Sequence, residues 1–172
     1  FRAGLFAGDK AHPLRADAHG LISLAPNAIA HAFQVSDGNP LVGVEGRAAL
    51  MRNLGQALKA RPDLFGREAR IGGLYDYLKA HAVQDGKLPA TAILAAVLEG
   101  LGPIWPSRMT LDGQNLGDVW RHRGLMSGDL TSGLVPFHKL SQWLSYSLLE
   151  IFEEAGIAVT GLDDLTGLPE YR

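Results

Sequence analysis

The chain has 172 residues, of which 47% are hydrophobic and 20% are charged, and its formal net charge is −2. This length and balance predict one folded domain with a proper core and argue against disorder. Because phosphate contacts need a clustered positive surface, and the sequence has no block of Lys and Arg, nucleic-acid binding is disfavoured.

The chain has no cysteine. Disulfides, thiol catalysis and cysteine-based zinc sites are therefore excluded, which suits a reducing cytosol. We see no apolar run long enough to span a bilayer and no signal-peptide pattern, so we expect a cytoplasmic protein without membrane contact. The chain begins with Phe1 and stops at Glu170-Tyr171-Arg172, and we interpret it as a piece of a longer protein.

The first third of the chain predicts loops and two helices. Residues 1–23 lack a clear period and predict loop with at most a short helix, whereas residues 25–34 predict two or three helical turns. A turn cluster covers residues 36–46. A longer helix is predicted over 43–60, and Pro62 follows it as a stop signal.

Two further helices are predicted in the middle of the chain. The first covers residues 70–84. The second runs from Pro89 to Gly102, and its apolar residues are so dense that we expect it to be central. Residues 107–133 then form a loop-rich insert punctuated by glycines, with short strands at most. A loop of this length predicts either a functional role or poor order.

The strongest helical pattern covers residues 134–156. Pro136 suits its first turn and Gly156 its end. Apolar residues at spacings of three and four define the side that we expect to face the core: Phe137, Leu140, Leu144, Leu148, Ile151, Phe152 and Ala155. A short strand at 157–159 and further turns are predicted after this helix.

A polar flank lies beside this apolar side. His138, Gln142 and Tyr146 follow one another at intervals of four, and Trp143 is adjacent. The flank is either a buried surface that hydrogen-bonds to neighbouring loops or the wall of a binding pocket. In the second case the Gly-rich insert with Asp118 should fold over it, because a buried glutamine amide needs partners.

Together these patterns predict a mostly α fold. We expect a single helical domain over residues 1–172, with about five helices, the loop-rich insert and at most a small β-hairpin near 109–122. We see no internal boundary and no repeat.

Several catalytic signatures are absent from the sequence: it has no phosphate loop, no HExxH pair and no GxSxG elbow. His19 and His31 share no helical turn, so we interpret each as structural and expect neither a metal nor another cofactor. A metal-dependent hydrolase remains one alternative. Its ligands would come from His19, His31, His122, His138 and Asp118.

Five phrases of the sequence are long and unusual: GNPLVGVEGRAAL, LGPIWPSR, LGDVWRH, LVPFHKLSQWLSYSLLE and LDDLTGLPEYR. They resemble the family called domain of unknown function 1688, which includes fungal proteins implicated in uracil catabolism (the Urc/Urg group). The resemblance runs from about Gly38 to Arg172. It implies a cytosolic pyrimidine-degradation pathway proposed to pass through a ribosyl-urea-type intermediate, and proteins that are longer than this chain.

The closing PEYR also resembles an acidic-Tyr-Arg phrase of the queuosine-salvage nucleoside hydrolases, an all-helical family in which the acidic residue attends the glycosidic carbon. Glu170 stands here in place of that family's Asp. The likeness favours cleavage of an N-ribosyl bond. Such cleavage needs a carboxylate at the oxocarbenium-like transition state and a polar or aromatic pocket for the base or urea.

We therefore predict a hydrolase that acts on a small-molecule pyrimidine nucleoside or urea derivative, with Glu170 as the catalytic carboxylate and Asp118 as its rival. The predicted substrate-binding residues offer amide hydrogen bonds, aromatic stacking or phosphate contacts: His138, Lys139, Gln142, Trp143, Tyr146, Trp120, His122 and Arg172. The rival hypothesis is a non-catalytic ligand-binding or scaffold protein of the same pathway, in which these residues are turn caps, core side chains or surface pairs. The oligomeric state is left open.

Overall fold

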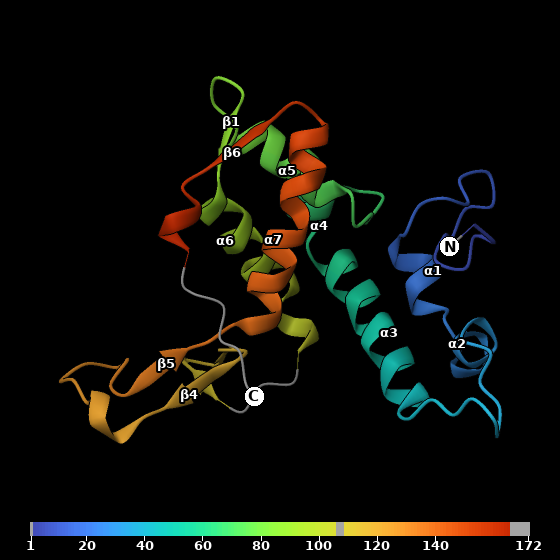
Figure 1. The fold of residues 1–172 in the computed structure, drawn as a ribbon, viewed down its shortest axis with the longest axis horizontal. Helices are drawn as coiled ribbons and strands as arrows, with labels where there is room; N and C mark the ends of the chain where they lie inside the picture. Colours follow the sequence, from blue (N-terminus) through green and yellow to red (C-terminus); the bar gives the residue numbers. More distant parts are fainter. Residues whose placement is uncertain (1, 106–108, 166–172) are drawn as a thin grey trace. The chain divides into compact units, whose positions relative to one another are not determined.

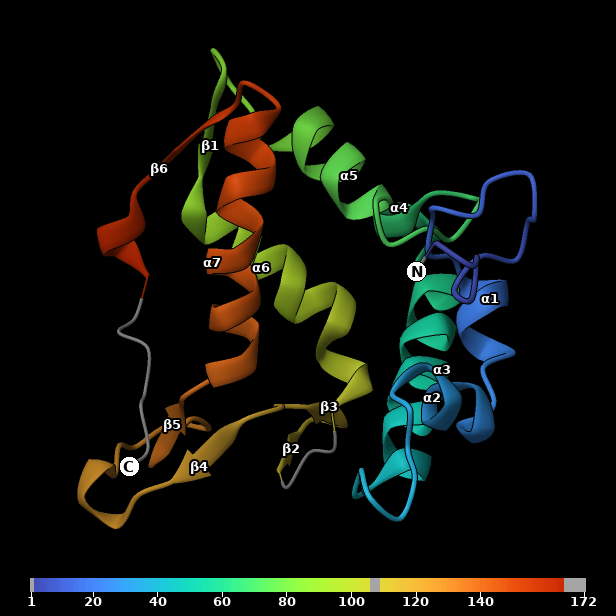
Figure 2. The same cartoon turned by 45° about the vertical axis from the view of Figure 1, so that its right-hand side comes forward.

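The computed structural model describes residues 2–105 and 109–165. The chain divides into two compact units between Tyr77 and Leu78, inside the helix α5 (Gly73–His81). Figures 1 and 2 show the elements of each unit from two directions. Seven α-helices and six short strands lie in the described ranges, which confirms a mainly helical fold. A single domain over the whole chain stays a prediction.

The first unit is built from helices joined by loops. Its helices before α5 are α1 (Ala18–Ile22), α2 (Pro26–Ala32), α3 (Val44–Ala60) and α4 (Pro62–Phe65). The predictions over 25–34 and 43–60 are confirmed by α2 and α3. Pro62 does more than stop the preceding helix. It opens α4, because its fixed φ suits a first helical turn, where its missing N–H would have had no partner.

Small residues let α1 lie close to α3 (Figure 2). A Cβ added at Gly55 would stand 2.8 Å from Ile22 Cγ1 and 2.9 Å from the carbonyl oxygen of Ala18. Asp17 caps α1, since its Oδ1 accepts a hydrogen bond from the Gly20 N–H at 3.0 Å. This cap supplies a partner to one of the N–H groups that a helix start leaves unpaired.

The second unit combines two long helices with paired strands. Its elements after α5 are β1 (Lys87–Pro89), α6 (Ala90–Leu101), the 3-10 turn η1 (Gly102–Ile104), β2 (Thr110–Leu111), β3 (Gln114–Asn115), β4 (Val119–Arg121), the 3-10 turn η2 (Arg123–Leu125), β5 (Leu134–Pro136), α7 (Lys139–Glu154), β6 (Ala158–Thr160) and the 3-10 turn η3 (Leu162–Asp164). The helix α6 packs against α7, β1 and η3. Ile93, Val97 and Leu101 are buried on it, so α6 is a core helix of this unit.

The strands form three two-stranded sheets. The antiparallel pair β2–β3 is the hairpin expected near 109–122. Two further pairs correct that expectation: β4 runs antiparallel to β5, with Trp120 opposite Val135, and β1 runs parallel to β6, with Leu88 opposite Val159. These pairs join segments that are distant in sequence, so a local pattern could not reveal them.

The start of α7 is later than predicted. Residues 134–136 form β5 instead of a first helical turn, because their pairing with β4 supplies partners for backbone groups. His138 then turns the chain into the helix with φ 46° and ψ 38°. The predicted end is confirmed, since Gly156 has φ 77° after the last helical turn.

The buried side of α7 also differs from the prediction. Leu140 and Ile151, expected in the core, are 55% and 50% exposed, and the buried positions are Ser141, Gln142, Ser145 and Phe152. Two of these buried positions are serines. The burial of Ser145 costs little, because its hydroxyl donates to the Ser141 carbonyl at 2.9 Å. Within the described ranges, no helix is long and apolar enough to cross a membrane.

The packing of α1 on α3 predicts opposite effects for two alanine substitutions in α3. Gly55→Ala should lower the free energy of unfolding by about 1–2 kcal/mol, because overpacking costs more than the gain in helix propensity. Gly46→Ala is the matched control. A Cβ there meets nothing within 4 Å, so this variant should be stabilised by up to about 1 kcal/mol. Urea unfolding of both variants checks the difference, and equal effects would contradict the close packing.

Candidate functional site

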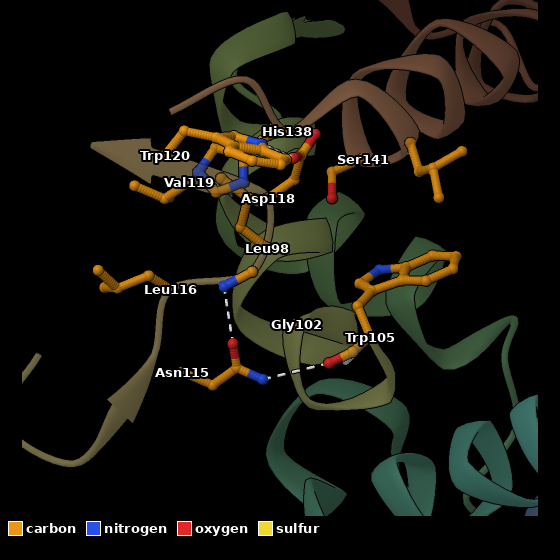
Figure 3. A pocket seen from close by; sticks show the side chains of 12 residues that line it. Leu98, Gly102, Trp105, Asn115, Leu116, Asp118, Val119, Trp120, His138 and Ser141 are labelled. Atoms are coloured by element: carbon orange, nitrogen blue, oxygen red, sulfur yellow. Dashed lines mark hydrogen bonds between the residues drawn. The ribbon is translucent and has the colours of Figure 1, made fainter. Parts of the chain in front are cut away.

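The second unit contains a pocket of about 700 Å³, which lies within the size range of small-molecule sites. Its walls come from the end of α6 with η1, from the segment between β3 and β4, and from the start of α7. Figure 3 shows the lining side chains. Leu98, Leu116, Val119 and Leu140 supply apolar surface, and the remaining lining residues are glycines, aromatic side chains or polar groups.

Asp118 makes four hydrogen bonds, three of which connect its segment to the start of α7. Its main-chain carbonyl accepts from the N–H groups of Phe137 at 3.0 Å and His138 at 3.2 Å. Its carboxylate accepts from the Trp120 indole N–H at 3.0 Å and from the Lys139 N–H at 3.3 Å. The carboxylate therefore caps the start of α7, where a helix leaves N–H groups unpaired and its dipole favours negative charge.

His138 stands between the helix start and the turn before β4. Its positive φ is uncommon for a residue with a side chain and is typical of positions under functional or structural constraint. A Cβ added at Gly117 would lie 3.7 Å from His138 Nδ1, so the imidazole lies close to the Gly117 backbone. Burial lowers the pKa of His138 below its usual 6.5, while the negative charge of Asp118 raises it in part. The folded state thus favours a neutral imidazole, which offers one donor and one acceptor.

Two indole side chains flank the pocket. Trp105 follows η1 and Trp120 lies on β4, and Figure 3 shows them on different sides of the space. The Trp120 side is open to solvent, with 44% of the residue exposed. Ser141 points its hydroxyl into the same space (Figure 3). The pocket therefore offers flat apolar faces together with a carboxylate, an imidazole and a hydroxyl.

Only part of the predicted polar flank reaches this pocket, among the residues that the structure describes. Gln142 is 1% exposed and donates from Nε2 to the Phe137 carbonyl at 3.2 Å, so it lies in the core of the unit. Trp143 is 49% exposed and Tyr146 is half-buried, and neither lines the pocket. Lys139 contributes its backbone N–H to Asp118. The insert does fold against the start of α7, where Asp118 accepts hydrogen bonds from the N–H groups of Phe137, His138 and Lys139.

The remaining predicted residues lie elsewhere. His122 is exposed on the β4–β5 hairpin, where its Nδ1 accepts from the Gly124 N–H at 3.1 Å. Glu170 and Arg172 are outside the described residues. Throughout the described ranges, no three His, Asp or Glu side chains are grouped closely enough to hold a metal ion.

Three polar or aromatic lining residues were missing from the predicted site. Asn115 carried a signal that was overlooked, because an Asn two residues before a Gly is typical of a side-chain-stabilised turn. Trp105 follows Pro103 in a turn-rich stretch, which by itself indicates no ligand contact. Ser141 gave no signal, since a serine in an amphipathic helix is indistinguishable from a surface residue until its neighbours are known.

The family model described as "Protein of unknown function (DUF1688)" matches residues 1–172, which is the whole chain. The chain belongs to the DUF1688 family. The family resemblance of the sequence phrases is thereby confirmed. No solved structure matches this DUF1688 chain significantly.

Two curated relatives match the DUF1688 chain along its full length. "Uracil catabolism protein 4" of Lachancea kluyveri is 39% identical over 185 residues, which cover 100% of this chain and 42% of the relative. "Protein urg3" of Schizosaccharomyces pombe (strain 972 / ATCC 24843) is 38% identical over 175 residues, which cover 100% of this chain and 40% of the relative. The chain therefore spans about two fifths of the length of these relatives.

The contact between Asp118 and His138 predicts a specific titration. By NMR, the pKa of His138 should lie below 6.5, and Asp118→Asn should lower it further by removing the charge that raises it. Because the unfolded chain takes up this proton near 6.5 and the folded chain only at lower pH, this histidine should make folding less stable as pH falls below 6.5. Stability should recover as pH rises again to that value.

Asp112→Asn is the control for this titration. Asp112 is exposed in the β2–β3 turn, at φ 48°, a conformation that asparagine tolerates. This variant should leave the His138 titration unchanged. A rise in the pKa of His138 in the Asp118→Asn variant would contradict the assigned contact.

Proposed function

We propose that this chain is the part of a cytosolic uracil-catabolism protein that binds a pyrimidine-derived nucleoside or ribosyl-urea compound and hydrolyses its N-ribosyl bond. The observation that carries the proposal is the pocket in the second unit, which combines one carboxylate, one imidazole and two indoles. The name of the first relative, "Uracil catabolism protein 4", supports the pathway. The chemistry of the lining residues supports the reaction.

The pocket suits a ligand with a planar polar part. A pyrimidine or urea group can stack on an indole face, as nucleobases do on aromatic side chains. Trp105 and Trp120 provide such faces. The Ser141 hydroxyl can donate to or accept from the edge of the planar group, since a hydroxyl offers both functions. The apolar residues Leu98 and Leu140 would exclude water around it.

The proposed reaction consumes one water molecule. The bond between the ribosyl C1′ and the nitrogen breaks, and its electron pair leaves with the nitrogen, which takes up a proton. The water oxygen bonds to C1′ and loses one proton to a base. Positive charge builds up on the ribosyl ring during this step, so a fixed carboxylate nearby lowers the barrier.

Asp118 and His138 have complementary properties for this chemistry. The two hydrogen bonds at the Asp118 carboxylate fix its position, yet each oxygen has a second lone pair free to face substrate or water. His138, whose pKa is lowered by burial, is available in its neutral form to accept the proton of the water. We assign charge stabilisation to Asp118 and general-base catalysis to His138.

A non-catalytic ligand-binding role is the second candidate, and one observation favours it. The donors at the Asp118 carboxylate belong to the helix start and to Trp120, so the fold alone can account for this residue. In that case the pocket would bind the same class of compound without cleaving it. The two candidates predict different effects on turnover when the negative charge of Asp118 is removed and its cap on the start of α7 is kept.

Asp118→Asn makes this distinction in the full-length protein. Asparagine is also a good capping residue, and its Oδ1 can keep the bond to the Lys139 N–H while the bond to the exposed Trp120 indole is lost. The variant should therefore fold, with a melting temperature only slightly below that of the unmodified protein. For hydrolysis we expect kcat/KM to fall by about 10²–10³-fold, as for the loss of one electrostatic contact in a transition state. Free ribose released from a panel of pyrimidine nucleosides and ribosyl-urea is the measurement.

Asp112→Asn is again the matched control, and it should retain full activity. Ligand binding without ribose release by the unmodified protein would favour the non-catalytic candidate. If the unmodified protein neither binds nor cleaves any member of the panel, the proposed function is wrong.

A further inference from the structure

Asn115 bridges two walls of the pocket through its side-chain amide. Its Oδ1 accepts a hydrogen bond from the Gly117 N–H at 2.7 Å. Its Nδ2 donates to the main-chain carbonyl of Trp105 at 3.2 Å. Figure 3 shows both bonds, which leave the Asn115 amide in different directions.

We propose that Asn115 is a positioning residue that fixes the Trp105 wall of the pocket relative to the Asp118 wall. This inference rests on the proposed function, because it assigns Asn115 a part in the same site. Asn115 acts through its neighbours, and the carboxylate, imidazole and indoles remain the groups assigned to the substrate.

The bond to Gly117 controls the approach to Asp118. Gly117 has φ 65°, a left-handed conformation that glycine adopts readily. A side-chain oxygen that accepts from the N–H two residues later is a common way to hold such a turn. Because Gly117 directly precedes Asp118 and lies against the His138 ring, the turn sets the position of both polar groups.

The bond to Trp105 acts over a longer distance in the sequence. It joins β3 to the residue that follows η1, ten positions earlier. The carbonyl of Trp105 belongs to the same residue whose indole lines the pocket. A shift of this backbone would therefore move the stacking surface relative to Asp118.

An amide is well suited to this position. It presents one acceptor and a pair of donors on one planar group, whereas a carboxylate only accepts and a methyl group does neither. Asn115→Asp should therefore keep the bond to Gly117 and lose the bond to Trp105. Asn115→Ala should lose both.

These variants are best compared by NMR of the full-length protein, with the Trp105 indole N–H signal and the His138 titration as readouts. In Asn115→Ala we expect both to change, and the pKa of His138 should move toward 6.5 as the ring becomes less buried. In Asn115→Asp we expect the Trp105 signal to move while the Gly117 turn persists. Gln114→Ala, at the exposed neighbouring position of β3, should change neither.

Turnover provides a second and separate readout. If the protein cleaves N-ribosyl bonds, Asn115→Ala should lower kcat/KM at least tenfold at an unchanged melting temperature, and Gln114→Ala should not. If the unmodified protein has no such activity, the proposed function fails, but the NMR comparison still decides whether Asn115 holds the two walls together.

Two results would overturn the inference. One is an unchanged Trp105 signal in Asn115→Asp, which decides the matter even if Asn115→Ala fails to fold. The other is a kcat/KM of Asn115→Ala within twofold of the unmodified value although the two NMR signals have moved. Movement of the signals together with loss of turnover supports the positioning role.

Discussion

The hydrogen bonds between Asp118 and the start of α7 are the constraint on which the second unit's pocket depends. The main-chain carbonyl of Asp118 holds the N–H groups of Phe137 and His138, which brings β4, β5 and the helix start together. The carboxylate then caps the helix through Lys139. One residue therefore supports the fold and places a negative charge in the pocket. No separate group is needed to stabilise this carboxylate, because the helix dipole stabilises the negative charge that the proposed reaction would use.

Close packing of α6 against α7 determines which side of the helix faces the pocket. Ser141 and Ser145 are buried on α7, which packs against α6. The Ser145 hydroxyl donates a hydrogen bond to a carbonyl of its own helix, so its burial does not leave the hydroxyl without a partner. Leu140 is partly exposed, and it lines the cavity together with His138 and Ser141. Packing between two helices thus selects the pocket side chains.

Family membership and pocket geometry bear on different parts of the functional question. The DUF1688 family model is described as of unknown function and one relative is named for uracil catabolism, whereas the proposed reaction rests on the carboxylate, imidazole and indoles in one pocket. The chain spans about two fifths of its curated relatives. The activity of the whole protein is therefore addressed by experiments on the full-length chain, and the pocket supplies the residues to vary.

The sequence by itself determined the class of the fold, most helix positions and the family. Helical periodicity and the flanking Pro and Gly residues placed α3 and α6, and Gly156 marked the end of α7, because these features depend on residues a few positions apart. Asp118, Trp120 and His138 were also recognised as candidates, and the insert with Asp118 was expected to fold over the flank that begins with His138. Only the tertiary structure decided the β4–β5 and β1–β6 pairs, the buried side of α7, and the positions of Asn115 and Ser141 in the pocket. These depend on backbone pairing and helix packing between distant segments, which override the preference of any single stretch.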